Sequence, residues 1–355
     1  MRCRIVQRPP LLCQTRGERL PWKQGEYRMM IVPAYWAEAR LQDRYRGRPV
    51  VVRRFGWSDD DQDAAQVHAD ARAREALDDI LSGQTVPRRE RRTNYGVEGI
   101  PIREQIVQRR DDVIVTRNSY GALCLNTPDV LFADIDHVPT PSGCALPLLG
   151  ALGLLAAGAL IGGALGNFNI GLAAGGIAIV VVNAIMSQRR RRRLARSGGA
   201  EGIALQRVQA FVEHHSDWHL RAYRTPAGLR VLAMHATFEP QDAQVHAFFK
   251  ALGTDTLYAR MCTLQHCFRA RLTPKPWRLG IIARIRPPVA AWSAEQASNP
   301  DRLAWIAEYE RKSAGFAACA YVRSFGDERR VDAKAERVRD LHDRMSRALD
   351  NLPLG

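Results

Sequence analysis

The segment VLFADIDHVP (130–139) ends an apolar run with two aspartates, Asp134 and Asp136. Side chains of a β-strand alternate between faces, so residues i and i+2 point the same way. Two like charges so close repel unless a cation, a shared proton or water separates them. Carboxylate pairs at strand ends hold divalent ions that grip nucleotide phosphates. We therefore expect Asp134 and Asp136 to bind Mg²⁺ or Mn²⁺ and to be catalytic; the alternative is that they cap a turn or pair with arginines.

A two-metal site usually needs a third carboxylate. The sequence offers several candidates and does not choose among them: Glu239, Asp242, Asp255, Asp327 and Glu328.

The segment RAYRTPAGLRV (221–231) has the alternation and central turn of a β-hairpin. Guanidinium groups bind phosphate in a bidentate manner, and a hydroxyl adds a further donor. The hairpin therefore predicts phosphate contacts from Arg221, Arg224, Thr225 and Arg230. Equally, its arginines would be solvated or would pair with the two aspartates.

The segment CFRARLTPKPWRLG (267–280) interleaves basic residues with Trp277 in a proline-stiffened stretch. Such a pattern holds backbone phosphates while a base stacks on the ring. The predicted phosphate contacts are Arg269, Arg271, Lys275 and Arg278. Contact with anionic lipid at a membrane surface, or an ordinary surface loop, is the alternative.

Residues 137–188 contain no Lys, Arg, Asp or Glu, and within them lie two apolar, glycine-rich runs, 145–165 and 170–186. A spanning helix needs about 20 apolar residues. Small residues at helical spacings allow two helices to approach closely. We predict a transmembrane helical hairpin over 144–186; a buried hairpin in a soluble core and a re-entrant hairpin are the alternatives.

The arginine run 189–193 directly after the second apolar segment sets the orientation, because basic residues favour the cytoplasmic side. We expect a bacterial inner-membrane protein with both soluble flanks in the cytoplasm and a basic linker at 187–200. The net charge of +15 lies mostly in two short segments, 1–28 and 189–196. A nucleic-acid-binding face is therefore allowed by the charge balance but not required.

The remaining composition is that of an ordinary folded protein. Seven scattered cysteines, an odd number, favour reduced thiols in the cytoplasm over a disulfide framework. The sequence has no GxSxG, Walker A, GxGxxG or HExxH motif.

The order of predicted strands and helices indicates an α+β fold with a mainly antiparallel sheet. A disordered basic segment covers 1–28, and the cytoplasmic domain is formed by 29–140 and 201–355, with the membrane hairpin inserted between two strands of one sheet. We expect an amphipathic helix from residue 34, then a strand at PVVVRRF, and three strands in a meander between 111 and 136. We also expect a strand at WRLGIIARIR (277–286).

Four segments together resemble a group of uncharacterised bacterial membrane proteins: RRFGWSD, VTRNSYGALCLNTPDVLFADID, YRTPAGLRVLA and CFRARLTPKPWR. More distantly, the chain is similar to the archaeo-eukaryotic primase superfamily, which has an RRM-like sheet with a DxD-type motif. Asp134 and Asp136 match that motif, and TPAGLRV resembles the second motif, with Arg230 where a histidine would be expected. No residue clearly fills the third motif. This resemblance implies metal-dependent nucleotidyl transfer.

The sequence thus predicts a membrane protein whose cytoplasmic domain binds nucleotide or nucleic-acid phosphate through a divalent metal, as a primase-like nucleotidyltransferase. The competing prediction is a non-enzymatic, membrane-anchored interaction or structural module, in which the aspartates are paired with the hairpin arginines.

Overall fold

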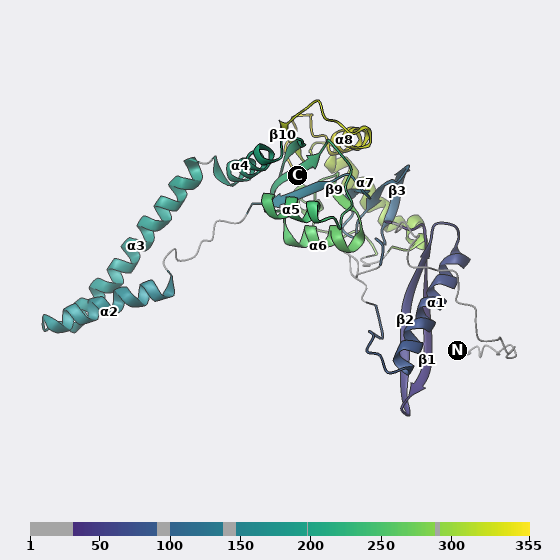
Figure 1. Ribbon diagram of the computed structural model, residues 1–355, viewed down its shortest axis with the longest axis horizontal. Helices are drawn as coiled ribbons and strands as arrows, with labels where there is room; N and C mark the ends of the chain where they lie inside the picture. Colours follow the sequence, from purple (N-terminus) through teal and green to yellow (C-terminus); the bar gives the residue numbers. More distant parts are fainter. Residues whose placement is uncertain (1–30, 91–99, 138–146, 197, 288–291) are drawn as a thin grey trace.

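The computed structural model describes residues 31–90, 100–137, 147–196, 198–287 and 292–355. The predicted basic segment 1–28 lies outside the described residues. The fold is α+β, built from antiparallel sheets and helices, as the sequence predicted (Figure 1).

An N-terminal unit consists of a two-stranded hairpin, β1 (Tyr35–Tyr45) and β2 (Arg48–Ser58), covered by α1 (Gln62–Leu81). The helix expected from residue 34 is therefore wrong, because this segment is the first strand. The turn at Arg46 and Gly47 has positive φ at both residues, the geometry that joins antiparallel strands most tightly. The helix begins after Asp61, whose side chain caps it.

One four-stranded sheet has the order β3-β4-β5-β9, with β3 (Gln105–Arg110), β4 (Val113–Arg117), β5 (Leu123–Thr127) and β9 (Phe268–Arg271). The other has the order β10-β7-β8-β6, with β10 (Ala320–Gly326), β7 (His219–Thr225), β8 (Gly228–Ala233) and β6 (Phe132–Asp136). The predicted meander is therefore wrong at its third strand, because β6 leaves β5 and pairs with β8. One hydrophobic core joins the two sheets.

Helices complete the domain: α4 (Gly199–His214), α5 (Ala243–Leu252), α6 (Thr256–Gln265), α7 (Pro300–Ser313) and α8 (Ala333–Ser346). Two short 3₁₀ helices, η1 (Pro276–Leu279) and η2 (Ala294–Ser298), lie in the loops. The strand expected at 277–286 is wrong. Burial does not alternate along it: Ile281 and Ile285 are buried in a small cluster with Trp305 and Tyr309, but Ala283 between them is exposed.

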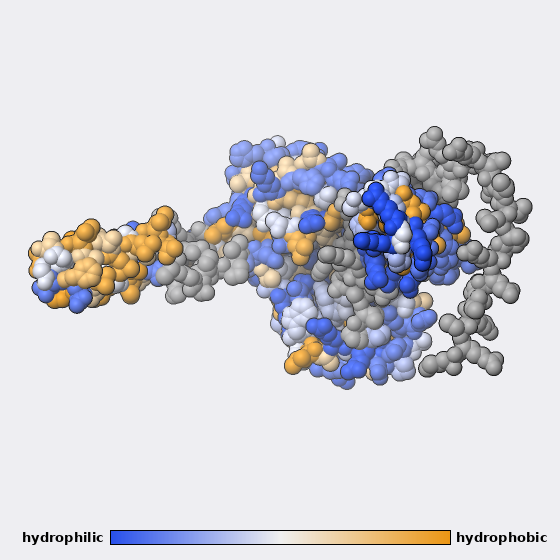
Figure 2. Space-filling model, turned by 90° about the horizontal axis from the view of Figure 1, so that it is seen from below, coloured by the Kyte–Doolittle hydropathy of each residue, from blue (hydrophilic) through white to orange (hydrophobic). Residues whose placement is uncertain are grey.

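The apolar segment forms a helical hairpin, α2 (Leu148–Ala164) and α3 (Phe168–Arg196), that projects away from the domain (Figure 1). Its surface is mostly hydrophobic, whereas the domain surface is largely hydrophilic (Figure 2). Among the described residues, one stretch is long and apolar enough to cross a membrane, Phe168–Arg189. The first part of the predicted basic linker, up to Arg196, is helical and forms the end of α3.

Glycines bring α2 and α3 into close contact, as the small-residue spacing predicted. A Cβ atom on Gly162 would lie 2.6 Å from the Cα of Gly171, and one on Gly175 would lie 2.8 Å from the carbonyl oxygen of Leu154. The neighbouring Gly163 faces open space. The helix contact therefore depends on glycine at particular positions on one face of each helix.

Substitutions at Gly162 and Gly163 should therefore differ in their effect on stability. Gly162→Val would overpack the helix contact and cost about 1–3 kcal/mol, whereas Gly163→Val adds the same side chain where there is room. Thermal unfolding of the detergent-solubilised protein, followed by circular dichroism, should show a lower midpoint for Gly162→Val alone. Equal midpoints for the two variants would contradict the packing.

Candidate functional site

The strand register places Asp134 directly opposite Arg230 in the β6–β8 pair. On its other side, Arg230 lies opposite Tyr223 of β7. Directly opposed residues of an antiparallel pair share a face, so these three side chains lie next to one another. Asp134 and Asp136 belong to one strand and share that face, as the spacing predicted.

Arg230 is almost fully buried, with 1% of its surface exposed. Its Nε donates to Asp134 Oδ1 at 2.9 Å, and its Nη2 donates to Oδ2 at 3.5 Å. Its Nη1 donates to the carbonyl oxygen of Arg271 at 2.8 Å. Burial has the largest single influence and opposes the charge on Arg230, but Asp134, with Cys319 and Tyr258, together outweigh it, so the pKa of Arg230 is raised. Asp134 therefore serves as the counter-charge of a buried guanidinium.

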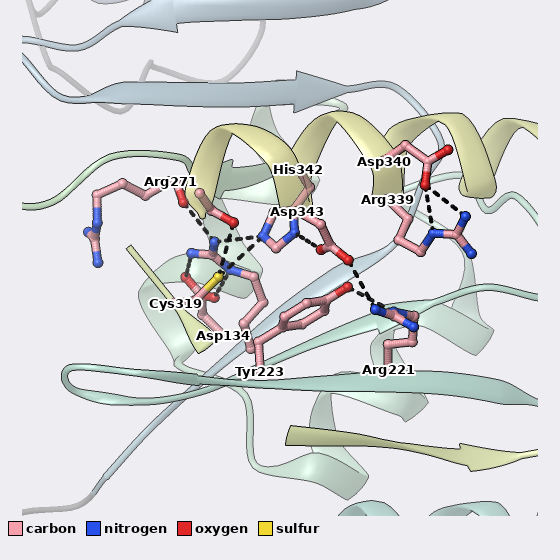
Figure 3. A network of polar contacts seen from close by, with 11 residues as sticks. Asp134, Arg221, Tyr223, Arg271, Cys319, Arg339, Asp340, His342 and Asp343 are labelled. Carbon is pink, nitrogen blue, oxygen red and sulfur yellow. Dashed lines mark hydrogen bonds and ion pairs between the residues drawn. The ribbon is translucent and has the colours of Figure 1, made fainter. Parts of the chain in front are cut away.

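The polar contacts continue from Arg230 into α8 (Figure 3). Arg230 Nη1 also lies 3.3 Å from His342 Nε2, and His342 Nδ1 lies 2.9 Å from Asp343 Oδ1. A nitrogen that accepts from a guanidinium must carry a lone pair, so His342 holds its proton on Nδ1 and donates it to Asp343. Asp343 Oδ2 in turn accepts from Arg221 at 3.0 Å, and Arg221 Nε donates to the hydroxyl of Tyr223 at 3.0 Å.

This network closes over one face of the sheet. Cys319 lies 3.8 Å from His342 Nε2 and 3.4 Å from the hydroxyl of Ser346, and all three residues are buried. Sequence reasoning missed His342, Asp343 and Cys319. The sequence of α8 is strongly charged, and nothing in it shows which polar residues turn inward.

Two other predicted phosphate contacts are engaged elsewhere. Arg224 forms a bidentate pair with Glu201 of α4, with both distances 2.7 Å. Arg269 is buried and donates to Glu104 at 2.6 Å. Thr225 ends β7 opposite Gly228. The predicted arginines of the hairpin therefore do not converge on a common anion.

Three predicted contacts do gather: Arg271, Lys275 and Arg278, which we call the basic cluster. Burial and the neighbouring Arg271 and Arg278 lower the pKa of Lys275, with Asp136 and Asp134 opposing this shift. Burial and Arg271 also lower the pKa of Arg278, with Asp136 opposing. Within the described residues no member of the cluster has a carboxylate within ion-pair distance.

Each member of the basic cluster lies close enough to Asp136, at the exposed end of β6, to interact with its charge. Burial, together with Asp255 and Asp134, raises the pKa of Asp136, while Lys275 and Arg271 act to lower it. Arg278 Nη1 is buried without a hydrogen-bond partner in the described part of the chain. In Figure 3 the guanidinium of Arg271 points away from the Arg230 network. Arg278 thus has a buried hydrogen-bond donor that the described residues leave unused.

Of the third-carboxylate candidates, Asp255 comes nearest to Asp134, whose carbonyl oxygen accepts from the Asp255 backbone N–H at 2.9 Å. The Asp255 carboxylate, however, caps α6 by accepting from the Tyr258 backbone N–H at 2.7 Å. No group of three His, Cys, Asp or Glu residues is arranged for a metal ion among the described residues. With Asp134 held by Arg230 and Lys275 beside Asp136, these residues do not fit a divalent cation as arranged.

Comparison of the chain with models of protein families, with curated proteins and with solved structures found no match.

The two aspartates should respond differently to neutralisation. Asp134→Asn leaves a buried guanidinium without its counter-charge, which costs about 3–5 kcal/mol. Asp136→Asn removes repulsion from Asp134 and Asp255 and should leave stability unchanged or slightly higher. Urea unfolding in mild detergent measures both. Equal stability of the two variants would show that Asp134 is not the structural partner of Arg230.

Proposed function

We propose that the protein is a membrane-anchored binding module whose soluble domain holds a phosphate-bearing anion at the basic cluster. The observation that carries this proposal is the contrast between two sets of cations. Arg221, Arg224, Arg230 and Arg269 each pair with a carboxylate of the protein. Arg271, Lys275 and Arg278 have no such partner among the described residues, and they lie close enough for Arg271 and Arg278 to lower the pKa of Lys275.

A phosphate group suits this cluster because it supplies both charge and acceptors. Its oxygens would accept from the guanidinium forks of Arg271 and Arg278 and from the ammonium of Lys275. The buried Nη1 of Arg278 would gain the acceptor that it lacks. Of the nearby carboxylates that would repel the anion, Asp134 is paired with Arg230, and burial raises the pKa of Asp136.

The membrane part of the proposal rests on α3, whose apolar stretch leads directly into a run of arginines. Basic residues at the end of a span favour the cytoplasmic side. We propose that α2 and α3 cross the inner membrane of a bacterium together and that the domains on both sides of the hairpin lie in the cytoplasm.

Primase-like nucleotidyl transfer with Mg²⁺ or Mn²⁺ remains the second candidate. The same-face pair of Asp134 and Asp136, with Asp255 nearby, is the observation in its favour. We favour the binding module because Arg230 occupies both oxygens of Asp134.

Calorimetry on detergent-purified protein, with inorganic pyrophosphate in EDTA, separates the two candidates. The binding module should bind pyrophosphate without metal. Lys275→Ala should weaken binding about 10- to 100-fold, the loss expected for one charge-assisted contact. Lys312→Ala, on an exposed residue of α7, is the matched control.

Two results would contradict the module. One is no pyrophosphate binding by the folded wild-type protein. The other is binding that requires Mg²⁺ and disappears in a folded Asp136→Asn variant, which would favour the enzyme.

The pH dependence of binding follows from Lys275, whose pKa is lowered in the free protein. A bound anion stabilises the ammonium and raises its pKa, so binding takes up a proton between the two values. The affinity for the anion should be highest below the pKa of Lys275 in the free protein. It should fall as the pH rises through that pKa, which lies below the ordinary lysine value of 10.5. Lys275→Arg should shift this fall to higher pH; an unchanged profile would show that Lys275 is not in the site.

A further inference from the structure

The loop that carries Lys275 and Arg278, residues 273–287, also presents two large apolar side chains to solvent. Ile282 is 93% exposed and Trp277 is 54% exposed. Burying such a side chain is worth about 1.5–3 kcal/mol. Two such exposed side chains on one short loop indicate that another surface covers them.

The loop is held in place on both sides of Ile282. Ile281 and Ile285 are buried against Trp305 and Tyr309. Trp305 Nε1 donates to the carbonyl oxygen of Ala283 at 2.8 Å. Because both flanking isoleucines are anchored, the exposure of Ile282 follows from the fold and not from a loose chain.

The start of the loop is fixed in the same way. The hydroxyl of Tyr309 donates to the carbonyl oxygen of Pro274 at 2.6 Å. The Trp277 ring contacts Tyr120 edge-on, with ring centroids 5.4 Å apart, and lies under Lys275 Nζ at 5.3 Å. One side of the indole is therefore supported, and the rest remains open to solvent.

Basic residues accompany the apolar ones along the loop. Lys275 and Arg278 belong to the basic cluster, and Arg284 and Arg286 are exposed. Tryptophan prefers the boundary between lipid and water, and basic residues next to apolar ones favour anionic lipid surfaces. An anionic bilayer matches both features of the loop.

The anchor places such a bilayer within reach. Lys275 lies close enough to Asp136, at the end of β6, to act to lower its pKa. From Asp136 the chain runs to α2 at Leu148. Even fully extended, this connection spans roughly 40 Å. On the other side, α4 begins at Gly199, just after α3 ends at Arg196. The domain is thus tethered at both ends of the hairpin.

We infer that the 273–287 loop docks on the bilayer that holds the hairpin, with Trp277 and Ile282 inserted and the basic cluster on the phosphate of an anionic phospholipid. This inference rests on the proposed function and names its ligand as a lipid headgroup in place of a free nucleotide.

Quenching of tryptophan fluorescence by brominated lipid tests the docking directly. The full chain is placed in nanodiscs of zwitterionic lipid, with and without anionic phospholipid. Part of the quenching should be lost in Trp277→Phe and kept in Trp36→Phe, a tryptophan of the N-terminal hairpin. The part due to Trp277 should be greater in the anionic discs.

A second variant separates docking from anion binding. Ile282→Asn, which removes the apolar side chain without adding a charge, should reduce the quenching of Trp277 while leaving pyrophosphate affinity in detergent unchanged. Pyrophosphate binding without any quenching of Trp277 would overturn the docking and leave the proposed function standing. Quenching of Trp277 that is equal in both kinds of disc, without pyrophosphate binding, would overturn both headgroup recognition and the proposed function.

Discussion

A guanidinium removed from water must have a counter-charge, and Arg230 meets this requirement through Asp134. The pair fixes the register of β6 against β8, because a slip of one residue would turn one partner to the opposite face. The remaining donors of Arg230 hold the carbonyl of Arg271 and the ring of His342. The Asp134–Arg230 ion pair therefore connects the β10-β7-β8-β6 sheet to β9 and to α8.

This pairing also determines which groups remain for function. Asp134 is occupied, so Asp136 stands at the strand end with cations of the basic cluster as its nearest opposite charges. Arg271 illustrates the division, because its backbone carbonyl belongs to the buried network while its guanidinium points away from it (Figure 3). The buried network supports a cationic surface at the end of the domain from which the chain leaves for the apolar helical hairpin.

Local patterns predicted the parts of the fold that depend on local physics. The β7–β8 hairpin and the close contact of the glycine-rich helices follow from turn residues, alternation and small-residue spacing. The segment of β1 was predicted to be a helix because its apolar residues fit both the helical and the strand period. Its pairing with β2 makes it a strand. The partner of Arg230 lies 96 residues away, and His342 comes from another helix, so no local signal could separate paired from unpaired arginines.

The most direct test of this account is a double-mutant cycle on Asp134→Asn and Arg230→Met, measured by urea unfolding in detergent. If the two side chains form one buried pair, the double variant should cost less than the sum of the single variants by about 2 kcal/mol or more. Additive losses in the free energy of unfolding would show that the two residues act independently and would contradict the structural role of Asp134.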